Sequence, residues 1–158
     1  MKKLLALLIA CFLASATTGA DSSASPVFQI RLVLDAPSAD SDQMPLITKR
    51  ENTPANVLNV QRTILLDQTA LKSARANTDA LGHPIIDIVF SEKGTKEFAE
   101  ITRRNIRKRL AIIIGGKLYQ APVLRTEITG GKAQISGNFS QEEAKVFAKE
   151  ISKALKRQ

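Results

Sequence analysis

Residues 85–114 read IIDIVFSEKGTKEFAEITRRNIRKRLAIII, and this stretch decides the fold class. The run 85–90 is rich in branched apolar residues and is bounded by turn residues, so it is typical of a buried strand. The run 110–114 has the same character. Between them Ser91 can cap an amphipathic helix, in which buried-type positions recur three and four residues apart, at Phe98, Ile101, Thr102, Asn105 and Ile106.

The sequence after residue 114 predicts further antiparallel pairing. Gly115-Gly116 is typical of a two-residue hairpin turn that leads into a strand at 117–119. Another strand is predicted at 133–137, after a second pair of glycines. We therefore expect the strand at 110–114 to pair antiparallel with the strand at 117–119.

A second helix is predicted near the end of the chain. Ser140 and Glu143 have the spacing of a capping box, and apolar residues then repeat at three and four positions up to about Leu155. From residue 84 onward the order is strand, helix, strand, hairpin, strand and helix. This order favours an α+β fold, with a mainly antiparallel sheet and helices packed on one face.

The sequence before residue 84 is less regular. Residues 28–34 alternate apolar and polar side chains, which predicts one strand with one buried face. Residues 35–45 contain Pro, Asp and small residues without a period, and we expect an irregular surface connection there. Residues 57–66 suit one or two short strands. Residues 67–76 read as a short helix capped by Asp67.

The first twenty residues predict export. A positive start precedes an apolar run at 4–13, about half of the length that crosses a bilayer core. Small residues follow, so we expect a signal peptide over 1–20, cleaved after Ala20 or Ala16. In an alternative interpretation Cys11 belongs to a lipoprotein-type box and is lipidated, which anchors the chain to a membrane. In either case we expect the chain to leave the cytoplasm, and without lipidation we expect it to be periplasmic or secreted.

The domain organisation follows from these elements. We expect a signal peptide over 1–20, a tether and unassigned segment with one strand over 21–56, and an α+β domain over 57–158. The formal net charge of +8 is unevenly spread along the chain. Residues 21–90 carry 6 basic and 8 acidic side chains, whereas residues 91–158 carry 15 and 7.

The most basic stretch contains five cations within seven positions, at Arg103, Arg104, Arg107, Lys108 and Arg109. In the simpler interpretation they complement the dipole of the first helix and face water. In the functional interpretation they form a partner-binding patch for acidic polypeptide, an envelope protein or an anionic membrane surface. Nucleic acid is disfavoured, because an export signal removes the chain from its usual targets and few aromatic rings are available for stacking.

The chemistry of the chain argues against an enzyme. With one His and one Cys, a single chain cannot supply a tetrahedral zinc site or a redox Cys pair, and no cofactor or metal is implied. His83 lies in a Gly-Pro turn, where an exposed His without a catalytic role is the commoner case. Ser136 lacks the Gly-x-Ser-x-Gly spacing of a nucleophile elbow.

The run from Gly82 to Leu155 resembles the head subdomain of the first periplasmic domain of the SecD family, which belongs to the SecDF protein-export complex. The resemblance rests on an ordered set of residues: Gly94, Phe98, Leu110-Ala111-Ile112, Ala121-Pro122, Gly130-Gly131, Ile135-Ser136-Gly137 and Phe139. There are two departures from the family's pattern. Gly115-Gly116 stands where Asp-Gly is usual, and Arg107 stands where a Gly is usual.

The resemblance implies a function. SecD couples proton flow through its membrane portion to movement of periplasmic domains that hold emerging polypeptide. We therefore expect a non-catalytic exported domain that binds polypeptide segments or an envelope protein, through the basic patch or a sheet edge within 117–128. The alternatives are a secreted enzyme with an unrecognised site and an envelope protein that binds anionic lipid.

Overall fold

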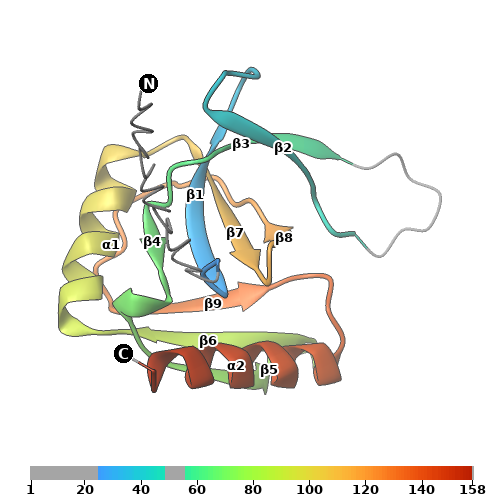
Figure 1. The fold of residues 1–158 in the computed structure, drawn as a ribbon. Coiled ribbons are helices and arrows are strands. Elements are labelled where there is room, and N and C mark those ends of the chain that lie inside the picture. The colour runs from blue at the N-terminus through green and yellow to red at the C-terminus, as the bar shows by residue number, and fades with distance from the viewer. Residues whose placement is uncertain (1–24, 49–55, 158) are drawn as a thin grey trace, which may run out of the picture.

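The computed structural model describes residues 25–48 and 56–157, and these form two antiparallel sheets and two α-helices (Figure 1). In chain order the elements are β1 (Phe28–Leu34), β2 (Ser41–Pro45), β3 (Val57–Gln61), β4 (Leu66–Asp67), a 3₁₀ turn η1 (Gln68–Ala70), β5 (Leu71–Thr78), β6 (Pro84–Phe90), α1 (Glu92–Arg104), β7 (Arg109–Ile114), β8 (Lys117–Gln120), β9 (Lys132–Ser136) and α2 (Gln141–Leu155).

The larger sheet is built around β1. Its strand order is β2-β3-β1-β7-β8, and the short β4 also pairs with β1. Phe28 and Ile30 of β1 pair with Ile114 and Ile112 of β7. Phe28, Ile30 and Ile114 are buried in the main core, together with residues of the smaller sheet and of both helices. The alternation of apolar residues in β1 thus points one of its faces into the centre of the molecule.

The larger sheet also curls around a second, smaller core. Leu46, just after β2, forms a parallel bridge with Leu118 of β8, and the Ile47 N–H donates to the Leu118 carbonyl oxygen at 2.9 Å. The edge strand β8 is thereby joined to the residues that follow β2, the strand at the opposite edge of the sheet. The residues enclosed in this way are Leu58, Val60, Ala111, Ile113 and Leu118.

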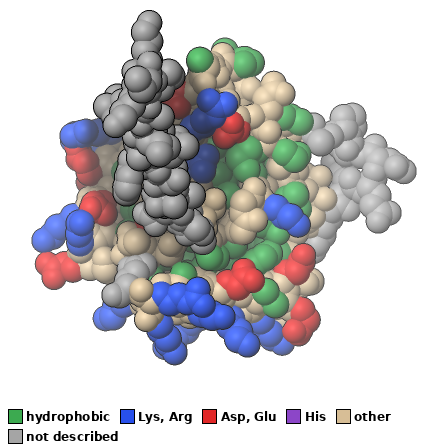
Figure 2. Space-filling view, viewed as in Figure 1, with side chains coloured by type: hydrophobic (Ala, Val, Ile, Leu, Met, Phe, Trp, Pro, Cys, Tyr) green, Lys and Arg blue, Asp and Glu red, His purple; other side chains and the backbone are tan. Residues whose placement is uncertain are grey.

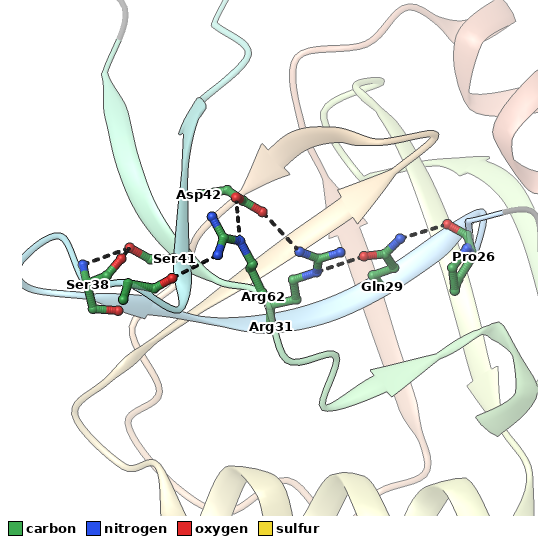
Figure 3. Close-up of polar contacts among 8 residues, drawn as sticks. Pro26, Gln29, Arg31, Ser38, Ser41, Asp42 and Arg62 are labelled. Carbon is green, nitrogen blue, oxygen red and sulfur yellow. Dashed lines mark hydrogen bonds and ion pairs between the residues drawn. The ribbon is translucent and has the colours of Figure 1, made fainter.

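A row of polar contacts ties β1, β2 and the residue after β3 together (Figure 3). Gln29 is buried, and its Nε2 donates to the Pro26 carbonyl oxygen at 3.0 Å while its Oε1 accepts from Arg31 Nε at 2.8 Å. Asp42 accepts from Arg62 Nε at 2.9 Å and lies 3.9 Å from Arg31 Nη1. A buried amide must be hydrogen-bonded to be tolerated, and this row supplies the bonds.

The smaller sheet has the order β5-β6-β9 and two unlike faces. Ile86, Ile88 and Phe90 on one face of β6 are buried in the main core. On the opposite face Asp87 accepts hydrogen bonds from Asn77 of β5 at 2.8 Å and from Gln134 of β9 at 3.0 Å. The sheet is therefore apolar towards the core and polar towards solvent, as expected for an antiparallel sheet covered on one side.

The helix α2 covers the apolar side of the smaller sheet near β5. Its Ala144, Ala148 and Ile151 are buried, and Ser152 Oγ donates to the Ala74 carbonyl oxygen of β5 at 3.2 Å. The predicted capping box is present, because Ser140 Oγ accepts from the Glu143 N–H while the Glu143 carboxylate accepts from the Ser140 N–H. The predicted start and end of this helix are confirmed.

The helix α1 is joined tightly to the turn η1. Ser91 caps the helix, since its Oγ accepts from the Gly94 N–H at 3.0 Å and donates to the Ala70 carbonyl oxygen at 3.1 Å. The Ser91 N–H also donates to that carbonyl, at 2.9 Å. Phe98 stacks on Phe90, with ring centroids 4.6 Å apart. The predicted cap at Ser91 and the predicted strands on both sides of this helix are confirmed.

The prediction of a short helix over 67–76 is wrong beyond its first turn. Asp67 does cap η1 by accepting from the Thr69 N–H, but the chain then continues as β5. A bulge between Leu71 and Ser73 explains the misleading spacing. Because of the bulge, Leu71 and Ala74 oppose Phe90 and Ile88, so residues three apart share one face of a strand.

The prediction that 21–56 contains one strand is also wrong, because residues 41–45 form β2 instead of an irregular connection. β2 pairs with β3 from Ser41 opposite Gln61 to Pro45 opposite Val57. It lies at the end of the strand order and has mostly polar residues, as edge strands often do. Both β1 and β2 belong to the same sheet as β3, β7 and β8.

The predicted α+β class with antiparallel sheets is confirmed, with the strands divided between two sheets. The expected signal peptide over 1–20 and the candidate lipidation site Cys11 lie outside the described residues. Within 25–48 and 56–157, neither helix has the length and apolar character needed to cross a bilayer.

The junction between α1 and η1 generates a prediction about Gly94. A Cβ at Gly94 would overlap the Ala70 carbonyl oxygen and lie 2.9 Å from the Ala70 Cβ. We expect Gly94→Ala to lower the free energy of unfolding by about 2–3 kcal/mol, although Ala favours a helix more than Gly does. Urea unfolding followed by circular dichroism measures this. Gly130→Ala is the matched control, since nothing lies within 4 Å of the Cβ it adds. Equal stability of the two variants would contradict the close approach.

Candidate binding surfaces

Three of the five cations predicted as a partner-binding patch are held by contacts within the fold. Arg103 donates to both oxygens of Glu100, each at 2.9 Å, and Arg104 forms an ion pair with the same carboxylate. The hydrogen bond from Arg103, with the charge of Arg104, holds the pKa of Glu100 below its ordinary value. Arg109 is half-buried in β7, and its Nε donates to the Ala121 carbonyl oxygen at 3.0 Å.

The other two cations, Arg107 and Lys108, lie in the turn between α1 and β7. Both are exposed, and neither side chain has a hydrogen bond or ion pair to another residue within 25–48 and 56–157. The backbone of the turn is fixed, because the Arg107 N–H donates to the Leu124 carbonyl oxygen and the Leu124 N–H donates to the Lys108 carbonyl oxygen, both at 2.8 Å. The patch predicted from sequence therefore offers two cations without an internal partner.

Arg107 has an unusual backbone conformation. Its φ is +73°, which makes it the only non-glycine residue with a positive φ in the described part of the chain. An L-residue in this left-handed region costs about 1 kcal/mol or more relative to Gly. A strained residue with an exposed, unpaired side chain is a candidate for function, since the fold alone would favour Gly.

The sheet edge predicted as a contact within 117–128 is partly covered. Leu118 of β8 already accepts from the Ile47 N–H. Further along, the Leu110 N–H donates to the Pro122 carbonyl oxygen at 3.0 Å, and Val123 bridges to Arg109. Much of this stretch therefore pairs with other parts of the larger sheet, which leaves less of the edge open for an added strand.

A hollow of about 430 Å³ lies between α2 and the β7–β8 hairpin, and we call it the α2–β8 groove. Its lining residues come from both elements: Ile114, Gly115, Lys117, Tyr119, Glu142, Glu143, Val146, Phe147 and Glu150. Figure 2 shows hydrophobic side chains at the surface above α2, with acidic side chains next to them. The groove thus combines an apolar base with carboxylates.

Aromatic rings form the base of the groove. Tyr119 is buried and packs against Phe147 at 5.1 Å and against Phe139 at 6.0 Å between ring centroids. Val146, one helical position before Phe147, is 51% exposed and has no comparable cover. An exposed Val beside packed rings gives a partner a small apolar surface to bury.

Carboxylates set the electrostatic character of the groove. Glu142, Glu143 and Glu150 come from α2, and Lys117 of β8 is the one cation among the lining residues. Burial raises the pKa of Tyr119 above its ordinary value, and the negative charge of Glu143 raises it further. The groove lining thus holds three carboxylates and one ammonium group, in a chain whose net charge is positive.

The sequence did not reveal this groove. Glu142 and Glu143 are explained by the cap of α2, and Val146 reads as an ordinary surface residue. The one available signal was that Val146 lies off the apolar repeat of the helix, next to Phe147. What makes it a site is its position beside β8, which only the tertiary structure supplies.

The two residues weighed for catalysis do not form a catalytic pair. His83 Nδ1 lies 3.1 Å from Asp79 Oδ2, and Ser136 Oγ accepts from Gln120 Nε2 at 2.9 Å. All four line one shallow hollow, but no hydrogen bond joins His83 to Ser136 among the described residues. A nucleophile needs a base within hydrogen-bond reach, and Ser136 has Gln120 instead. The described residues also hold no cluster of three or more His, Cys, Asp or Glu that could bind a metal ion.

Comparison with known protein families and sequences gives a consistent result. The family described as "SecDF, P1 head subdomain" matches residues 42–154. Protein translocase subunit SecDF of Thermus thermophilus is 49% identical over 84 residues, 53% of this chain and 11% of the relative. Subunit SecD of Sebaldella termitidis is 45% identical over 84 residues, 53% of this chain and 21% of the relative. Subunit SecD of Acidaminococcus fermentans is 29% identical over 118 residues, 75% of this chain and 28% of the relative.

Solved structures with a similar fold point the same way. A crystal structure of SecDF in its super-membrane-facing form has a TM-score of 0.64 and 33% identity, covering 80% of this chain and 18% of that one. A structure of SecDF, described as a membrane component that enhances protein export, has a TM-score of 0.58 and 34% identity, covering 82% of this chain and 61% of that one. The chain spans between about a tenth and about a quarter of the length of the three relatives above.

The strain at Arg107 leads to a prediction about stability. We expect Arg107→Gly to raise the free energy of unfolding by about 1 kcal/mol, because Gly adopts a positive φ without the steric cost. Arg107→Ala is the control, since it removes the same side chain but keeps a Cβ. Chemical unfolding of the three proteins measures the effect. An Arg107→Gly variant no more stable than Arg107→Ala would contradict the assigned strain.

The groove leads to a prediction about Tyr119. We expect Glu143→Gln to lower the pKa of Tyr119 while leaving it above the ordinary value, because burial is the larger cause of the shift. Gln keeps the spacing of the capping box, so the helix start should persist. The chain has one Tyr and no Trp, so the absorbance of tyrosinate during a pH titration reports this group alone. Glu142→Gln is the control. If both variants left the pKa of Tyr119 unchanged, the charge of Glu143 would not contribute to its shift.

Proposed function

Because the chain belongs to the family of SecDF P1 head subdomains, we propose that it binds polypeptide segments during protein export, with the α2–β8 groove as the binding site. Membership of this family supports the link to protein export, and the α2–β8 groove supports the proposal that the chain binds polypeptide. In this function the chain is a non-catalytic binding domain that acts after export, in the periplasm or outside the cell.

The groove suits a particular kind of polypeptide. Val146 and the ring of Phe147 can take an apolar side chain, which removes apolar surface from water on both partners. Glu150 forms no ion pair with another described residue, so it is available to a Lys or Arg of the ligand. Glu142 is already held by Lys145, at 2.8 Å. A segment in which apolar residues stand next to basic ones fits best.

The size of the groove favours an extended segment over a folded partner. About 430 Å³ accommodates a few side chains, not a whole domain surface. Weak, local recognition of this type tolerates many sequences, because one apolar pocket and one carboxylate place few demands on the ligand. A domain that contacts chains in transit needs such tolerance.

Arg107 and Lys108 offer a second contact, of opposite charge. Their side chains are exposed, and Arg107 keeps its place despite an unfavourable backbone conformation. In this function Arg107 and Lys108 bind acidic segments of a polypeptide or of an envelope protein partner. Together with the carboxylates of the α2–β8 groove, they would let one domain contact segments of either charge.

The proposed function predicts which surface binds a model polypeptide. A short synthetic peptide that alternates Lys with Leu should bind, and Val146→Ser should weaken binding about fivefold, because about half of one Val side chain is lost from the contact. Fluorescence anisotropy of the labelled peptide measures the affinity. A peptide with Glu in place of Lys should bind more weakly to the unaltered chain, since it meets the carboxylates of the groove.

Val123→Ser is the matched control for this experiment. Val123 and Val146 are the same residue type and are both 51% exposed, but Val123 does not line the groove. Circular dichroism checks that both variants fold. If Val123→Ser weakened binding as much as Val146→Ser, or if the Lys and Glu peptides bound equally well, the groove would not be the binding site.

A further inference from the structure

Four lysines lie along one flank of α2, at Lys145, Lys149, Lys153 and Lys156, and we call them the lysine stripe. Intervals of four, four and three residues bring side chains to the same side of a helix. All four residues are exposed. Figure 2 shows Lys and Arg side chains gathered along the lower margin of the molecule, where Figure 1 places α2.

The lysine stripe and the α2–β8 groove adjoin along one helix and share part of its exposed side. Each residue turns the helix by about 100°, so Glu150 of the groove lies about 100° from Lys149, whereas Val146 of the groove lies within about 20° of Lys153. The third side of α2 is buried through Ala144, Ala148 and Ile151. The exposed surface of α2 therefore carries the lysines next to the apolar and acidic residues of the groove, with Glu143 and Phe147 farthest around the helix from the lysines.

The role of the helix dipole explains only part of this arrangement. Lys153 lies in the last turn and Lys156 follows it, where cations are favourable. Lys149 is in the middle of the helix and has no acidic partner among the described residues. Lys145 does have one, at 2.8 Å from Glu142. Three of the four ammonium groups are thus available to an external anion.

We propose that the lysine stripe binds the anionic surface of a phospholipid membrane. A row of exposed ammonium groups along a helix can meet many headgroup phosphates at once, and each Lys near such a surface strengthens attachment. The apolar side of α2 is committed to the core, so the helix cannot insert as a free amphipathic helix would. Attachment is therefore electrostatic, reversible and sensitive to salt.

Two features favour a membrane over other polyanions. The stripe consists of Lys, which acts as a point charge, and lacks the planar Arg fork that suits specific phosphate recognition. The aromatic side chain of α2, Phe147, lines the groove on the other flank, so no ring of this helix accompanies the stripe to stack on nucleic acid bases.

The arrangement has a consequence for the domain as a whole. With the lysine stripe against a membrane, the α2–β8 groove lies next to the bound surface. The inference does not depend on the proposed polypeptide binding, since it rests on other residues. If both hold, α2 would orient the groove at the membrane surface.

Vesicle binding tests the inference on the full purified chain. Co-sedimentation with vesicles of phosphatidylglycerol and phosphatidylcholine should show binding at low salt, and vesicles of phosphatidylcholine alone should bind far less. The variant Lys149→Gln/Lys153→Gln/Lys156→Gln should bind the anionic vesicles about a hundredfold more weakly, because each Lys contributes about a factor of five. Binding should also fall steeply as salt is raised.

The control removes the same charge elsewhere, as Lys72→Gln/Arg125→Gln/Lys132→Gln, and should lose less than about fivefold in affinity for the vesicles. Equal losses in the two triple variants would overturn the inference, because net charge alone would then explain binding. Tighter binding of a single-stranded oligonucleotide than of anionic vesicles, lost in the stripe variant, would overturn it as well. Retained binding of the Lys-Leu peptide by the stripe variant separates this result from a failure of the proposed function.

Discussion

The contact between the start of α1 and the turn η1 holds the molecule together. The Ala70 carbonyl oxygen accepts from both the N–H and the Oγ of Ser91, and the missing side chain at Gly94 allows the helix to approach it. Because η1 connects a strand of the larger sheet to the first strand of the smaller one, this one carbonyl fixes α1 and the two sheets at a common point. Stacking of Phe98 on Phe90 then closes the core beside it.

The position of α2 follows from the other half of this core. Its small buried residues let the helix lie close to β5, and the hydrogen bond from Ser152 to Ala74 fixes its rotation. Once the rotation is fixed, the remaining side chains have no choice of direction. Phe147 must face the β7–β8 hairpin, where it packs on Tyr119, while Lys145 and Lys149 must lie on the opposite side of the helix. Packing of the buried side fixes the rotation of α2, and this rotation determines which exposed side chains lie beside β8.

Most of the regular elements could be predicted from the sequence, and the failures have physical causes. The strands at 85–90 and 110–114 and both long helices have strong periods and caps, so local pattern and tertiary structure agree. β5 was missed because a bulge between Leu71 and Ser73 breaks the period of two, and β2 because an edge strand buries little. The α2–β8 groove depends on residues about thirty positions apart, and no local pattern signals such a meeting.

Charge shows most clearly why a pattern in sequence differs from a surface in space. The five cations at 103–109 are close together in the chain, but Glu100 binds two of them and a carbonyl oxygen accepts from a third, so two of the five lack a partner among the described residues. The four lysines of the stripe are spread over twelve positions, so they do not form a basic run in the sequence. The helical repeat of 3.6 residues gathers them on one flank, where three of them meet no acidic partner among the described residues. The basic surface open to a partner is therefore set by helix geometry and by internal ion pairs. Counting charged residues along the sequence takes account of neither.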